Sequence, residues 1–532
     1  MAISGERIAA WAVDSLEKVY PTAEPGPGDR AVVEACRNEF GSAQVAVRAL
    51  RAVRELRASV STPTHVETGA TGVDIRPRFV GHIQVKGNTP DTPQEELDCV
   101  APCAVPDPLL LDASVSVEVG TTRAIWLTIF VPPYAEAGRW TAVVTVSADG
   151  ESLEIPLELT VHPVTLPTER HLWVTNWMNL GNFARHYGTE MYSPRFWRVV
   201  EEFARNVAAH HQNVIEAPQT LVQIFQEDDE SLSFDFTRYD AWVETFDRAG
   251  AARLIEGGPV ARRGGGKWET PWFDWMEFTV TRRRDGSRVR REPVTVIERL
   301  LRAVWAHVTE RGWASRYLQH VVDEPAPHTE EDYKRKSALV HQWVPNARYI
   351  EAMSCADMRG YLDIWVPNIN HFEEAWPAYF DLRGKSDFEL WFYTCMYPTG
   401  RYPNRFLDFS LLKTRILHWL NWRYRLTGYL HWGLNFWTED PFREDRIRED
   451  LPPGDCWIVY PGPDGPLDSL RWEQMREGLQ DFELLWLLGQ RSPGQADAIC
   501  ARLVPDPLTY ARDWRALRAA RREVVDALTA RT

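Results

Sequence analysis

The chain has few cysteines for its length, and they follow no pattern. Its 532 residues include seven cysteines, and only Cys99 and Cys103 lie close together in the sequence. An odd number without paired spacing predicts free thiols rather than a disulfide framework. A zinc site at these two residues would need two further ligands that the neighbouring sequence does not offer. We therefore expect neither a structural disulfide nor a metal site.

Long apolar runs and an excess of basic residues are also absent. No continuous apolar stretch is long enough to span a bilayer. The net charge of −15 excludes nucleic acid as a natural partner, since phosphate binding needs a basic surface. The first 21 residues carry charges inside their first apolar stretch, which is not the pattern of a signal peptide. As it stands the sequence predicts a cytoplasmic protein, or a secreted one if a leader was trimmed.

The first third of the chain alternates apolar and polar residues with a period of two. The pattern runs through Val115–Val119, Ile125–Val131 and Leu153–Val161, with turn residues such as Pro132-Pro133 and Asp149-Gly150 between the runs. Such alternation is typical of an antiparallel β-sandwich. We expect this domain to occupy residues 1–167.

From residue 168 onward, short apolar runs alternate with helical stretches, as in β/α units. Eight runs of this kind predict a (β/α)8 TIM-type barrel over residues 168–490. The C-terminal helical segment, 491–532, has one apolar face and should pack on the barrel. Between the third and fourth strands a polar, glycine-rich and basic stretch, 260–292, predicts a mobile loop. The eight expected strands are 172–177, 213–216, 253–256, 317–322, 348–352, 363–368, 389–394 and 428–432.

The fourth of these strands ends in two adjacent carboxylates, Asp323 and Glu324, followed by Pro325. Active sites of such barrels lie at the carboxyl ends of the strands, and charged side chains there need a polar cleft. The chain also contains 24 tryptophans, whose indole rings suit the apolar faces of sugars as well as protein cores. We interpret the acidic pair as the catalytic pair of a glycoside hydrolase.

A retaining glycosidase usually takes its nucleophile from a second strand. The end of the seventh strand is the natural place, but no carboxylate follows it until Asp408. We therefore expect the acetamido oxygen of a 2-acetamido sugar to act as the nucleophile, with Glu324 as acid/base and Asp323 orienting the amide. Crowding of the two charges should keep one carboxyl protonated to act as the acid. Tyr393 is placed to donate its hydroxyl to the acetamido carbonyl.

Four sequence segments stand out: Val322-Asp323-Glu324-Pro325, the run from Gly428 to Trp437, Tyr460-Pro461-Gly462, and the run from Arg471 to Glu483. Together they resemble glycoside hydrolase family 123. The resemblance implies a β-sandwich ahead of a (β/α)8 barrel and the activity of a retaining β-N-acetylgalactosaminidase. It also implies that Asp323 is the stabilising group and Glu324 the acid/base.

Other residues at predicted strand ends have two interpretations each. Trp432 and Trp437 form either the floor of a sugar subsite or part of the core, and Asn368 and Asn435 bind either sugar hydroxyls or loop backbone. Glu256 and Glu216 are either sugar ligands or salt-bridge partners, and Trp177 is a weaker sugar-binding candidate.

The sequence thus predicts an exo-acting enzyme that releases terminal β-linked N-acetylgalactosamine or another 2-acetamido sugar, without a cofactor. Two alternatives remain open. One is a barrel glycosidase acting on a non-acetamido sugar with a separate nucleophile, for which Glu256 is the candidate. The other is a carbohydrate-binding protein without catalytic activity.

Overall fold

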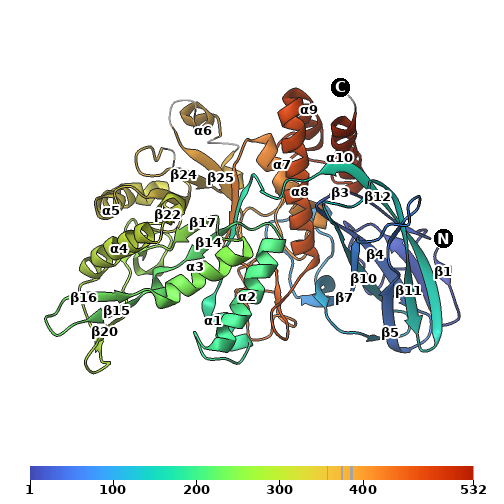
Figure 1. Ribbon diagram of the computed structural model, residues 1–532, viewed down its shortest axis with the longest axis horizontal. Helices are drawn as coiled ribbons and strands as arrows, with labels where there is room; N and C mark the ends of the chain where they lie inside the picture. The colour runs from blue at the N-terminus through green and yellow to red at the C-terminus, as the bar shows by residue number, and fades with distance from the viewer. Residues whose placement is uncertain (356, 373–375, 384–386, 531–532) are drawn as a thin grey trace. The chain divides into compact units, whose positions relative to one another are not determined.

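The computed structural model describes residues 1–355, 357–372, 376–383 and 387–530 (Figure 1). Their contacts divide into two compact units. One comprises Met1–His171, Thr399–Tyr424 and Gly433–Thr532, and the other comprises Leu172–Pro398 and Arg425–Trp432. The expected domain limits at residues 167 and 490 stay a prediction, because compactness alone does not tell which segments fold independently.

The N-terminal part of the first unit contains the antiparallel sheets that the sequence predicts. One sheet has the strand order β1-β2-β4-β10-β7-β8, and the other β3-β12-β11-β5-β9 with β6 paired to β11. The pair β3–β12 is parallel. The strands of the first sheet are β1 (Ile3–Ser4), β2 (Ile8–Val13), β4 (Glu39–Ala49), β10 (Thr122–Val131), β7 (Asp74–Val85) and β8 (Cys103–Leu110). Those of the second are β3 (Ala31–Arg37), β12 (Glu151–Thr165), β11 (Gly138–Ala148), β5 (Val53–Val60), β9 (Val115–Val117) and β6 (Thr64–His65).

Both sheets contribute to one hydrophobic core. Alternate residues of β10, such as Ile125 and Leu127, and of β12, such as Ile155 and Leu157, belong to the same buried cluster. Period-two alternation places every second side chain on one face, so this pattern in the sequence encodes the shared core.

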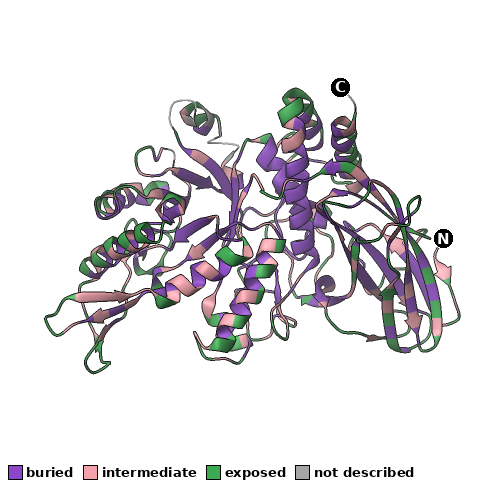
Figure 2. Cartoon of the chain, viewed as in Figure 1, coloured by how far each residue is buried: buried purple, intermediate pink, exposed green. Residues whose placement is uncertain are grey.

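The described residues of the same unit also form α-helices from the second half of the chain: α7 (Leu411–Arg423), α8 (Leu470–Arg491), α9 (Pro493–Leu503) and α10 (Trp514–Thr529). Helix α8 is buried along most of its length (Figure 2). A buried charge without a partner is strongly destabilising, so the acidic side chains of this helix need cations beside them. Asp481 accepts from Arg415 at 2.8 Å and from Arg521 at 3.1 Å. On α10 the expected apolar face is buried through Leu517, Val524, Val525 and Leu528.

The expectation of free thiols at Cys99 and Cys103 is wrong. The two residues form a disulfide, with their Cα atoms 6.6 Å apart. The other five cysteines all lie in the described part of the chain, and none of them is disulfide-bonded. The odd total concealed this pair, because a single local bridge can coexist with thiols elsewhere.

The second unit contains all eight predicted parallel strands. They form one sheet in the order β13-β26-β25-β24-β23-β22-β17-β14. The first and last strands are joined by a hydrogen bond from Asn213 N to Val174 O at 3.2 Å rather than by a regular ladder, so the barrel is nearly closed. The strands are β13 (Trp173–Asn176), β14 (Val214–Ala217), β17 (Leu254–Gly257), β22 (Tyr317–Gln319), β23 (Arg348–Met353), β24 (Ile364–Pro367), β25 (Glu389–Tyr393) and β26 (Gly428–His431).

Helices connect most of these strands, but the alternation is incomplete. Among the residues described between β23 and β24, 354–355 and 357–363, no helix forms. The helices of this unit are α1 (Leu180–His186), α2 (Pro194–Ala209), α3 (Thr237–Ala249), α4 (Pro293–Glu310), α5 (Glu330–Trp343) and α6 (Trp376–Arg383). None of the helices in the described part of the chain is both long and apolar enough to cross a membrane.

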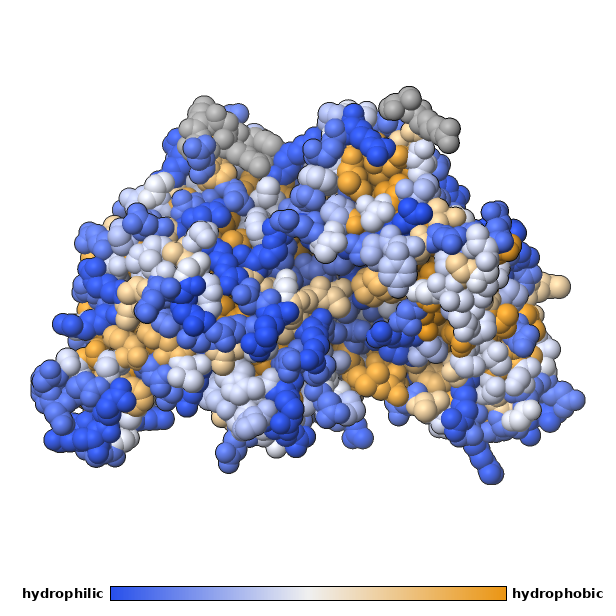
Figure 3. Space-filling view, viewed as in Figure 1, coloured by the Kyte–Doolittle hydropathy of each residue, from blue (hydrophilic) through white to orange (hydrophobic). Residues whose placement is uncertain are grey.

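The insertion expected as a loop between the third and fourth strands contains short strands. β18 (Ala261–Arg263) pairs with β19 (Phe273–Trp275). β20 (Val280–Arg282) and β21 (Arg288–Val289) join β15 (Gln223–Gln226) and β16 (Leu232–Asp235) in a four-stranded sheet. The surface over this sheet, at lower left in Figure 3, is hydrophilic. There Arg283 donates to Glu227 at 2.6 Å.

Candidate functional site

The acidic pair follows β22, as predicted, but the strand ends earlier than the sequence suggests. β22 stops at Gln319, and Val322 makes only an isolated parallel bridge to Ala261. Val321 and Val322 are fully buried, whereas Asp323 is exposed and Glu324 half-buried. The two carboxylates therefore lie where the chain leaves the interior at the carboxyl end of the barrel.

The backbone at Glu324 has a left-handed conformation, with φ of 54°. A non-glycine residue in this region costs on the order of 1 kcal/mol or more, and such strain concentrates at functional sites. Tyr393 and Arg263 hold this residue from two directions. The Tyr393 hydroxyl donates to Glu324 Oε1 at 2.6 Å, and Arg263 Nη2 donates to the Glu324 backbone oxygen at 2.6 Å.

Glu351, in the middle of β23, fixes the segment that leads to the pair. Its carboxylate accepts hydrogen bonds from the backbone N–H groups of Val321 at 2.5 Å and Val322 at 3.0 Å. Glu351 has no solvent exposure. These two N–H groups leave the strand ladder, so without the carboxylate they would be buried and unpaired. Sequence reasoning missed this residue, although a carboxylate between Ile350 and Ala352 breaks the apolar run expected of a buried parallel strand.

His320 connects Glu351 to a second buried carboxylate. Its Nδ1 lies 2.8 Å from Glu351 Oε2, and its Nε2 lies 3.9 Å from Glu256 Oε2. Burial opposes the charge on His320, but Glu351 and Glu256 outweigh it and raise its pKa well above the usual value. Burial also raises the pKa of Glu351. Because Glu351 already accepts two backbone N–H groups, which favours the carboxylate, we place the shared proton on His320.

Glu256 is held inside the barrel. It has no solvent exposure, and its Oε2 accepts from Trp177 Nε1 at 2.9 Å and from Thr175 Oγ1 at 3.4 Å. Burial and the charge of Glu256 raise the pKa of Glu216 to about 7, with His320 acting in the opposite direction. Thus Trp177, predicted as a sugar ligand, contacts Glu256 in this structure.

The pKa of Asp323 is raised. The main cause is that the surrounding protein displaces water from the carboxyl group. The negative charges of Glu324 and Glu351 add to the shift, while His320 opposes it. Water reaches the exposed Asp323 side chain and screens part of this effect. Crowding of the two charges was expected to keep one carboxyl protonated, and the pKa of Asp323 is raised.

The remaining predicted site residues lie in two places. Asn368, after β24, donates from Nδ2 to Tyr397 O at 3.2 Å, and its buried Oδ1 has no hydrogen-bond partner among the described residues. Trp432, after β26, is half-buried beside His431. Asn435 and Trp437 belong to the other compact unit, where both are buried and Trp437 Nε1 donates to Val459 O at 2.7 Å. Sugar binding by these four residues stays a prediction.

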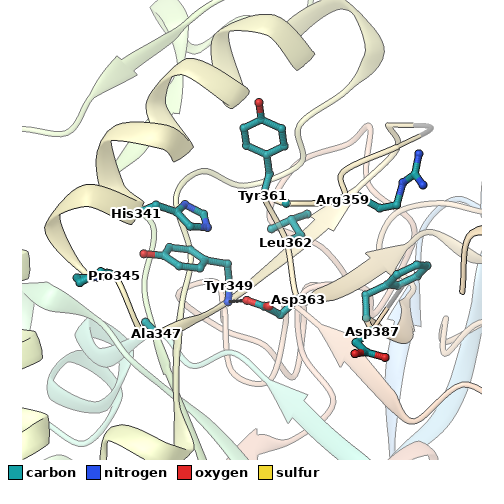
Figure 4. Close-up of a pocket in the computed structure, with 11 residues that line it drawn as sticks. His341, Pro345, Ala347, Tyr349, Arg359, Tyr361, Leu362, Asp363 and Asp387 are labelled. Carbon is teal, nitrogen blue, oxygen red and sulfur yellow. Dashed lines mark hydrogen bonds between the residues drawn. The ribbon is translucent and has the colours of Figure 1, made fainter. Parts of the chain in front are cut away.

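A polar pocket of about 410 Å³ lies at the opposite end of the strands (Figure 4). It is lined by Tyr349, at the start of β23, and by Asp363, just before β24. The Tyr349 N–H donates to Asp363 Oδ2 at 2.7 Å. Since the acidic pair follows the carboxyl end of β22, this pocket is separate from it.

Over residues 177–488 the sequence matches the family model described as "Glycoside hydrolase 123, catalytic domain". The matched range exceeds half of the chain. The chain belongs to glycoside hydrolase family 123. The resemblance noted in the sequence is therefore confirmed, and this family 123 enzyme is a hydrolase that acts on glycans.

A solved structure shares this fold. The chain is similar to a family 123 glycoside hydrolase from Clostridium perfringens, described in work on glycolipid glycan hydrolysis, with a TM-score of 0.77 and 14% identity over 98% of this chain and 97% of that chain. Much weaker similarity is found to a GH10 xylanase from termite gut (TM-score 0.33, 10% identity, 85% of this chain and 99% of the other). A β-D-glucuronidase of Dictyoglomus thermophilum gives a TM-score of 0.34 at 8% identity, covering 84% and 68% of the two chains. A search of curated protein sequences found no match.

Replacing Glu351 by leucine in this family 123 enzyme should lower kcat about 10- to 100-fold with little change in KM, because the acidic pair loses its positioning bonds. Unfolding should also become easier by about 1–3 kcal/mol for each N–H left unpaired. Steady-state kinetics and thermal melting measure the two effects. Glu351→Gln keeps one acceptor oxygen and should recover part of kcat.

Glu389→Gln provides the matched control. Glu389 is at the amino end of β25, where it binds Arg348 at 2.6 Å. The Glu389→Gln variant should be less stable than the wild type, with an unchanged kcat. An equal decrease of kcat in the Glu351 and Glu389 variants would contradict the positioning role of Glu351.

Proposed function

We propose that this enzyme is a retaining exo-β-N-acetylgalactosaminidase that uses the 2-acetamido group of its substrate as the nucleophile. The observation that supports this most directly is the difference in solvent exposure between the acidic pair and the carboxylates around it. Asp323 and Glu324 are accessible, whereas Glu256 and Glu351 have no exposure and are hydrogen-bonded. A protein nucleophile must reach the anomeric carbon, and Glu256 is too deeply buried to do so.

In the first step Glu324 gives its proton to the glycosidic oxygen as the bond from that oxygen to the anomeric carbon breaks. The acetamido oxygen forms the new bond to the anomeric carbon from the opposite face, which produces an oxazolinium ion. Asp323 accepts a hydrogen bond from the amide N–H and offsets the developing positive charge. In the second step Glu324 removes a proton from water, the water oxygen attacks the anomeric carbon, and the ring reopens. The configuration of the anomeric carbon is inverted in each step, so the product has the same anomeric configuration as the substrate.

The raised pKa of Asp323 in the free enzyme has a place in this scheme. A bound acetamido group brings an N–H donor, and hydrogen bonding to the ionised form lowers a carboxyl pKa. Substrate binding would then favour ionised Asp323, and the proton held by the pair would move to Glu324, where the reaction needs it. The Tyr393 hydroxyl, which donates to Glu324 at 2.6 Å in the free enzyme, would become available to the acetamido carbonyl.

The preference for N-acetylgalactosamine rests on the family. The related Clostridium perfringens enzyme is described as acting on glycolipid glycans, and we propose glycans with a terminal 2-acetamido sugar as the substrate class here. The reaction as written requires no metal or organic cofactor. A cytoplasmic location stays a prediction.

Initial rates on matched chromogenic β-N-acetylgalactosaminide, β-N-acetylglucosaminide and β-galactoside substrates test the proposal. We expect turnover of the acetamido sugars, with the galacto form preferred, and at least about 1,000-fold slower turnover of the galactoside, because it lacks the nucleophile. Equal rates on the galactoside would mean that a protein nucleophile acts. Sugar binding by calorimetry without hydrolysis of any substrate would indicate a binding protein.

A further inference from the structure

Two tryptophans of the insertion are unusually exposed. Among the tryptophans whose side chains the structure describes, only Trp268 and Trp272 reach 51% exposure, while most others are buried. Exposing a large aromatic ring is unfavourable in water, and two such rings kept accessible in one connection suggest a ligand.

The hairpin that carries Trp268 is attached to the segment immediately before the acidic pair. Its first strand, β18, begins where the N–H groups of Val260 and Ala261 donate to Val321 O at 3.1 and 3.0 Å. Ala261 also forms a parallel bridge with Val322, the residue before Asp323. The hairpin therefore starts at the carboxyl edge of β22 and extends the barrel on the side of the catalytic carboxylates.

Arg263 connects Trp268 to Glu324. The guanidinium group donates to the Glu324 backbone oxygen at 2.6 Å and lies over the Trp268 ring, 4.3 Å from its centroid. The same guanidinium group lies 4.9 Å from the centroid of the Phe273 ring. His328, which follows the acidic pair, lies 2.8 Å from the Trp268 backbone oxygen through its Nε2. The ring is thus held one guanidinium group away from the backbone of Glu324.

We propose that Trp268, with Trp272 beside it on the same hairpin, forms a leaving-group subsite that binds the sugar to which the released residue is linked. This inference rests on the proposed function, since it assigns Glu324 to the glycosidic oxygen. The acid must lie between the two sugars, so the second sugar occupies the Glu324 side of the bond. Arg263 covers one face of the Trp268 ring, and the part of the ring that stays exposed offers the apolar surface on which a pyranose ring stacks. The enzyme is then selective for glycans over simple glycosides.

Trp268→Ala tests the subsite with two substrates that share the released sugar. One is a β-N-acetylgalactosaminyl-galactose disaccharide, and the other is β-N-acetylgalactosaminyl fluoride, whose leaving group has no ring. We expect kcat/KM for the disaccharide to fall about 10-fold or more, the loss of one stacking contact, and that for the fluoride to change less than about 3-fold. Trp268→Phe keeps a ring and should retain most of the activity on the disaccharide.

Trp305→Ala is the control, because Trp305 is a half-buried tryptophan on α4, near Tyr317 at the amino end of β22. The Trp305→Ala variant should change kcat/KM by the same factor for both substrates. Equal losses on disaccharide and fluoride in Trp268→Ala, or no loss on either, would overturn the subsite.

Binding measured by calorimetry tests the subsite without relying on hydrolysis. With Glu324→Gln as the background, Trp268→Ala should weaken disaccharide binding about 10-fold and leave free N-acetylgalactosamine binding unchanged. Unchanged disaccharide affinity would refute the subsite. Failure of wild-type enzyme on both substrates would refute the proposed function alone.

Discussion

Glu324→Gln is expected to lower kcat/KM about 1,000-fold on the disaccharide and by much less on substrates with good leaving groups. Loss of a general acid costs on the order of 100- to 10,000-fold. A phenolate or fluoride leaving group departs without a proton, so only the second step, in which Glu324 acts as base, is still slowed. Steady-state kinetics across a series of aryl leaving groups measures the dependence, and added azide should restore turnover by replacing the activated water.

Glu330→Gln serves as the matched control for this variant. Glu330 begins α5 six residues later and pairs with Lys334 at 2.5 Å. It should leave kcat/KM unchanged on every substrate. A loss in Glu324→Gln that is the same for good and poor leaving groups would assign the acid role to another residue.

Asp323→Asn is expected to lower kcat about 100-fold or more on all acetamido substrates, whatever their leaving group. The amide side chain keeps its size but lacks the negative charge that offsets the oxazolinium ion. Azide should not rescue this variant, because the missing charge is needed in the first step, when the oxazolinium ion forms, and azide acts only in the second step. Rescue by azide would show that Asp323 acts on the water and not on the acetamido group.

The same variant should change how stability depends on pH. Because the pKa of Asp323 is raised in the folded protein, the folded state holds a proton that the unfolded state releases above about pH 4. Stability therefore falls as pH rises toward the folded pKa, and asparagine removes this loss. Melting temperatures measured from about pH 4 to pH 8 should shift in favour of Asp323→Asn as pH rises. A constant difference would mean that solvent screens Asp323 fully.

The strands of the barrel were predictable because each is a short apolar run closed by polar or turn residues. The position of the acidic pair was predictable for the same reason, since Asp323 and Glu324 directly follow the apolar run of the fourth strand. Glu351 was not, because it stands inside a strand and its role depends on a backbone segment some 30 residues earlier in the chain. Contacts of this kind depend on strand order and register, which a single sequence does not specify.

The insertion shows a second limit of sequence reasoning. Its glycines and arginines predicted a loop, and the strands β18 and β19 are only three residues each. β18 is anchored by the backbone of Val321 and Val322, which only the tertiary structure brings beside it. Asn435 and Trp437 show the same limit, since proximity to the eighth strand in sequence did not place them in its compact unit.

Because Glu351 binds the N–H groups of Val321 and Val322, the position of the acidic pair depends on one side chain rather than on the strand ladder of the barrel. In most sheets the point at which a strand ends is set by its neighbouring strands, so moving that point disturbs the whole ladder. Here one side chain of β23 receives the N–H groups that the ladder has released. Evolution or design could therefore move the acidic pair relative to the strands by substitutions at and around position 351, with the eight-stranded scaffold left intact.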